Sequence, residues 1–155
     1  MIAFRRGNLL DSSCDVIAHQ VNCCGVMGAG LALQIKQAYP KVFSQYKSKC
    51  NLARCAEELL GTIDICVMDF LPVVVNLYAQ VSFGRTGIYT NYDALRGCLI
   101  QLRDWITKHQ KHKTVLGFPY GLGCGLAGGD WAVVYDMIKA IFEHLDNIDV
   151  EIWRL

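Results

Sequence analysis

The sequence lacks any apolar run of about 18 residues, the length that a membrane-spanning helix requires, and the segment from Met1 to Asn8 lacks the apolar core of a signal peptide. Neither sign of charge is in excess, since 15 Lys and Arg residues balance 14 Asp and Glu residues. A general electrostatic nucleic-acid binder normally carries a clear basic surplus. These absences predict a soluble, cytoplasmic protein with no membrane partner and, at most, local contact with nucleic acid.

Paired metal-ligand spacing is also missing. None of the eight cysteines forms a Cys-x-x-Cys pair, which structural zinc sites commonly use. Several cysteines lie in apolar segments and are interpreted as small buried side chains in a reducing compartment. We therefore expect neither a metal site nor a cofactor. The cysteines are Cys14, Cys23, Cys24, Cys50, Cys55, Cys66, Cys98 and Cys124.

Repeats, linkers and low-complexity segments are absent as well, and 53% of the residues are hydrophobic. A chain of this length can bury a substantial core. We therefore expect one domain over residues 1–155, present as a monomer. The basic run from Lys108 to Lys113 is interpreted as the solvated end of a helix, where cations suit the helix dipole, with a nucleic-acid contact as the alternative.

Strand and helix patterns alternate along the chain. Segments rich in apolar and β-branched residues predict strands at Ile2–Arg6, Asp15–Val21, Ile63–Met68, Val73–Ala79, Thr114–Phe118 and Asp149–Leu155. Helical spacing of apolar residues predicts helices after Gly30, after Pro40, after the N-cap candidate Asn91 and after Asp130. Residues 52–60 fit either a short helix or a loop. The alternation predicts an α/β fold with a mixed sheet covered on both faces.

Two glycine-rich loops each connect a buried strand to a helix. The first runs from Asn22 to Gly30 and the second from Pro119 to Gly129, where five of eleven residues are glycine. Glycine lets the backbone approach a ligand closely, and backbone N–H groups at a helix N-terminus bind anions. Both loops should lie at the carboxyl edge of the sheet. They predict a phosphate-binding pocket, although either could be a tight turn without a ligand.

The second loop also contains a Gly-x-Gly-x-x-Gly pattern, from Gly123 to Gly128. A dinucleotide-binding fold would need an acidic residue at the far end of the next strand. Asp149 instead begins that strand, and the chain has no second mononucleotide-binding half after it. A dinucleotide-dependent dehydrogenase is therefore disfavoured.

Three segments resemble the macrodomain family, whose members bind ADP-ribose. They are Arg6-Gly-Asn-Leu-Leu10, the segment Ile17-Ala-His-Gln-Val-Asn22 with Gly25-Val-Met-Gly-Ala-Gly-Leu-Ala-Leu33, and Leu122-Gly-Cys-Gly-Leu-Ala-Gly-Gly-Asp-Trp131. The resemblance covers nearly the whole chain. It is closest to the macrodomains that remove ADP-ribose from proteins or DNA bases and to those that process ADP-ribose 1''-phosphate. It implies a three-layer αβα fold.

The resemblance also implies roles for individual residues. Asn8 would accept a hydrogen bond from the adenine amino group, and Asn22 would face the distal ribose. Trp153 could stack on adenine or could simply pack at the sheet edge. The ligand-binding residues implied are Asn8, Leu9, Asn22, Gly25, Val26, Met27, Gly28, Ala29, Gly30, Pro119, Gly121, Leu122, Gly123, Cys124, Gly125, Leu126 and Trp153.

The sequence departs from the subgroup at three positions. Asn8 replaces an aspartate, Gln80 stands where enzymes of the subgroup have a catalytic lysine, and Ala127 stands where some have a catalytic aspartate. Without the lysine, covalent Schiff-base chemistry is excluded. Asn22, Gln80 and Asp130 are the candidate catalytic residues, with helix capping as the alternative role for Asp130. His19 is expected to be a core histidine rather than a base.

Three functions fit this pattern. The leading one is hydrolysis of an ADP-ribose derivative, with ADP-ribose or an ADP-ribosylated macromolecule as the partner and nucleic acid only as a modified substrate. The second is a reader that binds ADP-ribosylated targets without cleaving them. The third is a phosphatase acting on ADP-ribose 1''-phosphate, in which His19 or Asp130 would be the acid or base.

Overall fold

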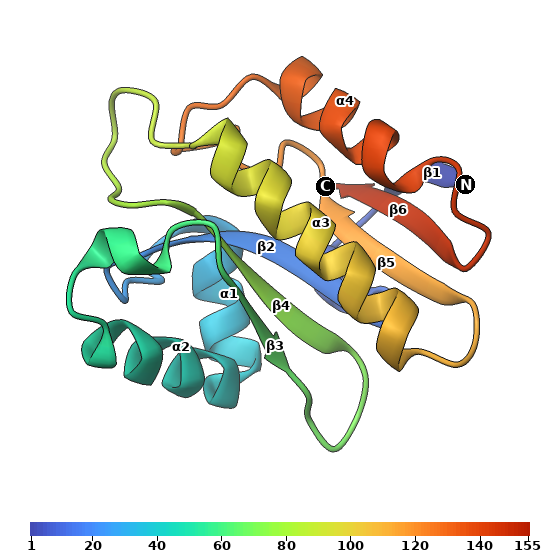
Figure 1. Ribbon diagram of the computed structural model, residues 1–155, viewed down its shortest axis with the longest axis horizontal. Coiled ribbons are helices and arrows are strands. Elements are labelled where there is room, and N and C mark those ends of the chain that lie inside the picture. Colours follow the sequence, from blue (N-terminus) through green and yellow to red (C-terminus); the bar gives the residue numbers. More distant parts are fainter.

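The computed structural model describes residues 1–155 as one six-stranded sheet with helices on both sides (Figure 1). The strands are β1 (Ile2–Arg6), β2 (Val16–Asn22), β3 (Ile63–Cys66), β4 (Val73–Gln80), β5 (Thr114–Pro119) and β6 (Ile148–Arg154). The α-helices are α1 (Gly30–Ala38), α2 (Pro40–Leu52), α3 (Tyr92–His109) and α4 (Trp131–Phe142), and two short 3₁₀ helices are η1 (Leu9–Asp11) and η2 (Ala56–Leu59).

The strand order is β1-β6-β5-β2-β4-β3, and only β3 pairs antiparallel with its neighbour. The other five strands are parallel, so their carboxyl ends share one edge of the sheet. The central strands β2 and β4 are almost wholly buried. This burial explains their near-continuous apolar sequence, because a parallel sheet is covered on both faces.

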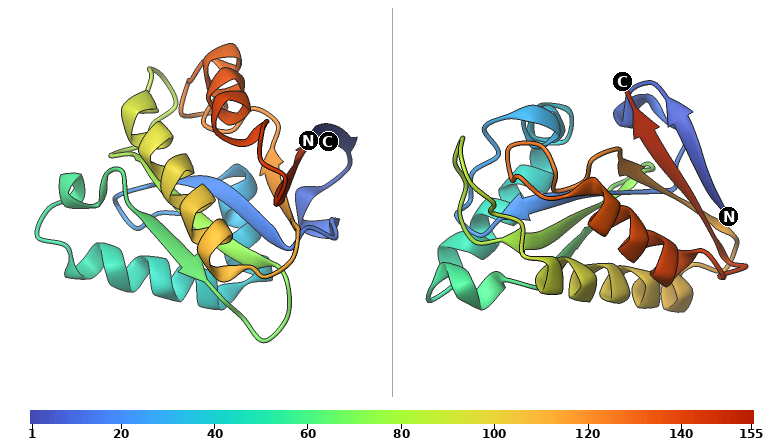
Figure 2. Two further views of the ribbon diagram at one scale, coloured as in Figure 1. Left: turned by 45° about the vertical axis from the view of Figure 1, so that its right-hand side comes forward. Right: turned by 90° about the horizontal axis from the view of Figure 1, so that it is seen from above.

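Alternating residues of the central strands pack into two different apolar clusters. Val16 and Val75 belong to the cluster that α3 and α4 complete, whereas Ile17 and Val74 pack with Ile35 of α1. Because successive side chains of a strand point to opposite faces, these clusters lie on opposite sides of the sheet. Figure 2 shows the same layers, with α3 and α4 on one side and α1 on the other. The predicted three-layer αβα macrodomain fold is confirmed.

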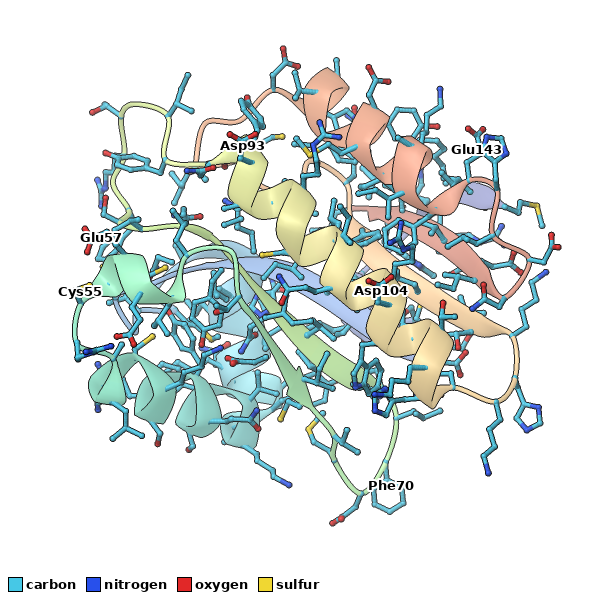
Figure 3. All side chains as sticks on the ribbon, in the orientation of Figure 1. Cys55, Glu57, Phe70, Asp93, Asp104 and Glu143 are labelled. Atoms are coloured by element: carbon cyan, nitrogen blue, oxygen red, sulfur yellow. The ribbon has the colours of Figure 1, made fainter.

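The predicted elements are present with shifted ends. Residues 52–60 contain the end of α2 at Leu52 and the 3₁₀ helix η2 (Ala56–Leu59). The prediction of a short helix is therefore correct for these residues, and the prediction of a loop is correct for the residues between them. Strand β3 ends at Cys66 rather than Met68, and the exposed Phe70 lies at the tip of the connection to β4 (Figure 3). No helix is long and apolar enough to cross a membrane.

Candidate functional site

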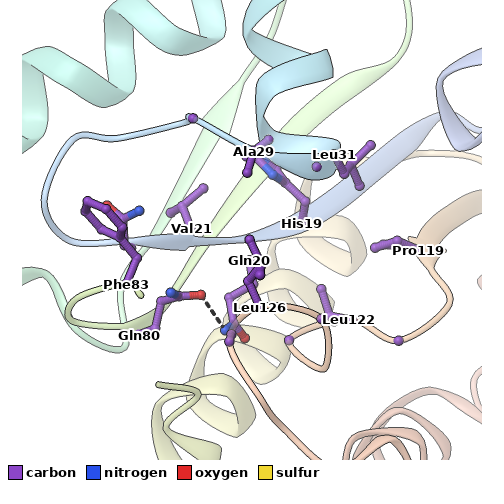
Figure 4. Close-up of a pocket in the computed structure, with 18 of the residues that line it drawn as sticks. His19, Gln20, Val21, Ala29, Leu31, Gln80, Phe83, Pro119, Leu122 and Leu126 are labelled. Atoms are coloured by element: carbon purple, nitrogen blue, oxygen red, sulfur yellow. Dashed lines mark hydrogen bonds between the residues drawn. The ribbon is translucent and has the colours of Figure 1, made fainter. Parts of the chain in front are cut away.

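A cavity of about 610 Å³ opens at the carboxyl ends of β2, β4 and β5. Strand β5 pairs with β2 only at Val16 and Ile17, so the two strands separate toward their carboxyl ends and leave space between them. Figure 4 shows this cavity, with Pro119 at one end and Gln80 and Phe83 at the other. It is lined by His19–Asn22, Val26, Gly28–Ala32, Gln80, Phe83–Arg85, Pro119–Gly123 and Gly125–Ala127.

The first glycine loop is shaped by Asn22 at the end of β2. The Asn22 Oδ1 atom accepts a hydrogen bond from Cys24 N at 3.0 Å, and the Nδ2 atom donates to the Val26 carbonyl at 2.8 Å. The buried Tyr46 hydroxyl lies 2.7 Å from the same Oδ1 and accepts from Val26 N at 3.1 Å. An amide nitrogen carries two hydrogens, so one N–H of Asn22 is left for a ligand.

Helix α1 begins at the cavity without a side-chain cap. Ala29 occupies the N-cap position and makes no capping hydrogen bond, whereas Asn91 and Asp130 cap α3 and α4. The first N–H groups of a helix have no partner within the helix and carry the positive end of its dipole. Because Gly28 to Ala32 line the cavity, this end of α1 can receive an anion.

The second loop needs glycine because other backbone segments lie against it. A Cβ atom at Gly128 would lie 2.4 Å from the Gly87 carbonyl oxygen, and one at Gly129 would lie 2.6 Å from the Gly123 carbonyl oxygen. Gly125 is different, because a Cβ atom there would meet nothing within 4 Å. Gly125 therefore faces open space at the cavity, and its backbone can approach a ligand without obstruction from a side chain.

Two side-chain amides and a hydroxyl form a chain of hydrogen bonds at the cavity wall, and Figure 4 shows the bond between Gln20 and Gln80. Gln20 Nε2 donates to Gln80 Oε1 and to Thr90 Oγ1, both at 2.9 Å. Gln80 Nε2 donates to the Ser82 carbonyl and Thr90 Oγ1 to the Gly123 carbonyl. Since carbonyl oxygens only accept, they fix the direction of every bond in the chain. One N–H of Gln80 remains free, and Gln20 Oε1 is buried without a partner.

His19 lines the cavity as a neutral side chain. Its Nε2 lies 2.6 Å from Asn76 Oδ1, and Asn76 Nδ2 in turn donates to Asp64 Oδ2 at 3.2 Å. Because Asn76 presents an acceptor, the His19 proton lies on Nε2 and Nδ1 carries a lone pair, which has no partner. Burial lowers the pKa of His19 to about 4, against the opposing effects of Asn76 and Asp64. The expected core position is present, and His19 cannot donate a proton near neutral pH.

No carboxylate, lysine or cysteine lines the cavity. Its ionisable groups are His19, the phenol of Tyr120 and the exposed guanidinium of Arg85. Nearby, burial raises the pKa of the Cys124 thiol to about 11, so it is a neutral thiol. The absence of negative charge suits a diphosphate, and the absence of a base with a pKa near 7 restricts general base catalysis.

Most of the predicted ligand-binding and catalytic residues meet at this cavity. Those in its lining are Asn22, Val26, Gly28, Ala29, Gly30, Gln80, Pro119, Gly121, Leu122, Gly123, Gly125 and Leu126. Others lie behind it. Leu9 and Met27 are core residues, Cys124 Sγ donates to the Leu122 carbonyl, and the Cβ position of Gly25 faces Lys47 and Cys50 of α2.

The remaining three predicted residues lie outside the lining. Asp130 is the N-cap of α4, where its side chain accepts from Ala132 N at 2.9 Å. Asn8 is the N-cap of η1 and accepts from Leu10 N at 3.0 Å. Trp153 is paired with Pro119 across β6 and β5 and donates from Nε1 to Glu151. The capping role expected as the alternative for Asp130 is observed.

Among the lining residues that sequence reasoning missed, four carry polar or aromatic side chains: Gln20, Phe83, Arg85 and Tyr120. Gln20 is a polar residue within an apolar strand, which is a signal that could have marked it. Phe83 and Arg85 belong to a connection without periodicity. Tyr120 follows a proline at the end of a strand, and nothing in the sequence shows which way its ring points.

No protein-family model matches the chain. Among curated proteins, the DNA ADP-ribosyl glycohydrolase of Mycobacterium tuberculosis is 28% identical to it over 153 residues. The alignment covers 99% of this chain and 42% of that protein, so the chain spans less than half of the relative's length.

Solved structures match over the whole chain. The macrodomain of Mycobacterium tuberculosis DarG has a TM-score of 0.85 and 27% identity, and the match covers 100% of this chain and 98% of that one. Thermosipho africanus DarTG in complex with ADP-ribose has a TM-score of 0.79 at 18% identity, covering 99% of this chain and 42% of that one. The second likeness is one of fold alone.

Proposed function

Because the chain is a macrodomain, we propose that its cavity binds the ADP-ribose group and that it slowly hydrolyses the bond between ADP-ribose and a protein or nucleic acid. One observation carries the proposal: the uncapped start of α1 and the loop from Gly121 to Leu126 line the same cavity, which contains no carboxylate. Backbone N–H groups from both loops can then bind the two phosphates.

The strand order supports one orientation of the ligand. Strands β5, β2 and β4 are adjacent in that order, and neighbouring strands lie about 4.8 Å apart. Because β2 and β5 separate toward their carboxyl ends, a ligand across these ends extends at least about 10 Å from Pro119 to Gln80. At the β5 end, Tyr120 lines the cavity, and Trp153 lies beside Pro119. We place adenine at this aromatic end, with Asn8 and Trp153 as its proposed neighbours.

The distal ribose is then proposed to lie beside Asn22 and Gln80. Each side chain keeps one free amide N–H after its hydrogen bonds within the protein are counted. Hydroxyl groups accept such bonds, and two amides from neighbouring strands hold the sugar in one position. Positioning of this kind lowers the barrier by fixing the geometry of the reacting atoms.

The proposed reaction has no base on the protein. A water oxygen forms a bond to the anomeric carbon of the distal ribose as the bond to the leaving group breaks. The attacking water loses one proton to solvent, and the leaving group departs with the bonding electrons and takes one proton from solvent. Asn22, Gln80 and the phosphates of the ligand would orient the water, and loop N–H groups would stabilise the charge that develops. Turnover should therefore be slower than in relatives with a catalytic lysine.

The test is release of product from three substrates: ADP-ribosylated single-stranded DNA, a protein ADP-ribosylated on glutamate, and ADP-ribose 1''-phosphate. The proposal is supported if the wild type releases ADP-ribose from either macromolecule and the Asn22→Ala variant does not. Tight binding without release would overturn hydrolysis and favour a reader. Release of phosphate alone would favour the phosphatase. Circular dichroism is needed as a control, since Asn22 also shapes the loop through Val26 and Tyr46.

A further inference from the structure

The connection between β4 and α3 carries an exposed aromatic ring and an exposed cation to the Gln80 end of the cavity. Phe83, Gly84 and Arg85 belong to the cavity lining, and Phe83 is 52% exposed. Figure 4 shows Phe83 beside Gln80, away from Pro119. Arg85 makes no ion pair with any acidic residue of the chain. Both side chains are therefore available to something that enters the cavity from this end.

The same connection is anchored to both glycine loops. At its start, the Val81 carbonyl accepts from Cys23 N at 3.0 Å. At its end, the N–H groups of Tyr89 and Thr90 both donate to the Ala127 carbonyl, at 2.7 and 3.2 Å. These bonds fix the segment that carries Phe83 and Arg85 relative to the residues that surround the ligand.

We propose that Phe83 and Arg85 bind the group to which ADP-ribose is attached, and that this group is a base of single-stranded nucleic acid. This inference rests on the proposed function, because it takes the distal ribose to lie beside Gln80. The Phe83 ring would stack on the modified base or its neighbour, and the Arg85 guanidinium would pair with a flanking phosphate.

The chemistry of these side chains favours a nucleic acid over a protein. A base offers a flat face to an exposed phenylalanine ring, and stacking of bases on aromatic side chains is a main source of affinity in single-strand binding. A modified glutamate or serine side chain has no such face. The segment from Val81 to Thr90 also contains no aspartate or glutamate, so nothing within it repels a phosphate next to Arg85.

Two ligands separate this inference from the proposed function: free ADP-ribose and a short single-stranded DNA carrying ADP-ribose on one base. We expect the DNA ligand to bind about tenfold more tightly than ADP-ribose. Phe83→Ala and Arg85→Ala should each reduce that ratio of affinities at least threefold, and because the ratio compares the two ligands on the same variant, an effect on the ADP-ribose group itself cancels. Arg85→Ala should also make binding of the DNA ligand less sensitive to salt, because one phosphate contact is lost.

The chain offers matched controls for both substitutions. Phe70 is 86% exposed but lies in the connection that leads into β4, at the opposite edge of the sheet (Figure 3). Arg96 is an exposed arginine of α3 without an acidic partner. Phe70→Ala and Arg96→Ala should leave the binding of both ligands unchanged. Equal effects in these controls would show that nonspecific surface changes explain the result.

The outcomes are distinct. If free ADP-ribose does not bind, the proposed function fails. If ADP-ribose binds but the DNA ligand binds no more tightly, or its advantage survives Phe83→Ala and Arg85→Ala, the inference is wrong and the proposed function stands. A peptide ADP-ribosylated on glutamate provides the third arm. Tighter binding of that peptide, reduced by Phe83→Ala, would also contradict the inference and assign the two residues to a protein target.

Discussion

Gly125→Glu is the substitution that tests the cavity most sharply. Gly125 lies in the cavity lining, has a negative φ angle, and would place a Cβ atom in open space. A side chain therefore fits without strain in the backbone or a steric clash. The glutamate adds bulk and a negative charge where we place the diphosphate. We expect ADP-ribose binding to weaken strongly while the fold remains intact.

The size of the effect follows from Coulomb's law. At about 6 Å and an effective dielectric constant of about 40, each unit charge of the diphosphate repels the carboxylate by about 1.4 kcal/mol. Two such charges, reduced by salt screening, give about 2 kcal/mol. That value corresponds to about a 30-fold loss of affinity, to which any steric overlap with the ligand would add.

Calorimetric titration with ADP-ribose measures this loss, and circular dichroism with thermal unfolding checks the fold. Gly97→Glu is the matched control, because a Cβ atom at Gly97 also meets nothing within 4 Å but lies on α3, outside the cavity lining. Gly125→Ala should weaken binding much less, because it adds no charge. A folded Gly125→Glu protein with unchanged affinity would refute the two-loop diphosphate site.

The remaining predictions concern His19, Gln80 and Asp130. Because the pKa of His19 falls from 6.5 to about 4 on folding, the unfolded chain is protonated there first, so acidification from pH 6.5 to 4 should cost roughly 3 kcal/mol of unfolding free energy. The His19→Gln variant should not lose this stability, which urea titrations at several pH values measure. If its unfolding free energy depends on pH as steeply as that of the wild type, His19 is not a neutral buried imidazole. Gln80→Lys should raise the rate of ADP-ribose release, because lysine supplies an amine that can act as a nucleophile and glutamine does not; an unchanged rate with intact ADP-ribose binding would count against Gln80 as the catalytic position. Asp130→Ala should lower the unfolding free energy by about 1 kcal/mol through loss of the helix cap and leave the rate within twofold; a lost rate at unchanged stability would instead make Asp130 catalytic.

The two loops were predictable because their signal is local. Glycine at Gly28, Gly30, Gly123 and Gly125, between a buried strand and a helix, indicates close approach of the backbone to a ligand, and these residues do line the cavity. The same reasoning could not separate them from Gly25, whose Cβ position faces α2. Which side of a turn faces the ligand depends on packing between distant segments.

The other differences between the predicted site residues and those that line the cavity arise from the direction of the side chains. Gln20 reaches the cavity because β2 and β5 separate after Ile17, which depends on pairing between residues about a hundred positions apart. Trp153 lies near the end of β6 beside Pro119, whereas Asn8 lies beyond β1 and lines a separate pocket, and their side chains form hydrogen bonds with Glu151 and Leu10. Sequence patterns give strands and faces, whereas these orientations follow from tertiary contacts.

The central claim is that this cavity binds a diphosphate between two nucleoside-like ends. Calorimetric titration of the protein with ADP-ribose and, separately, with AMP tests it most directly, because the two ligands share adenosine and one phosphate. We predict a dissociation constant in the micromolar range or below for ADP-ribose and an affinity at least about tenfold weaker for AMP. Equal affinities, or no measurable heat with either ligand, would contradict the claim.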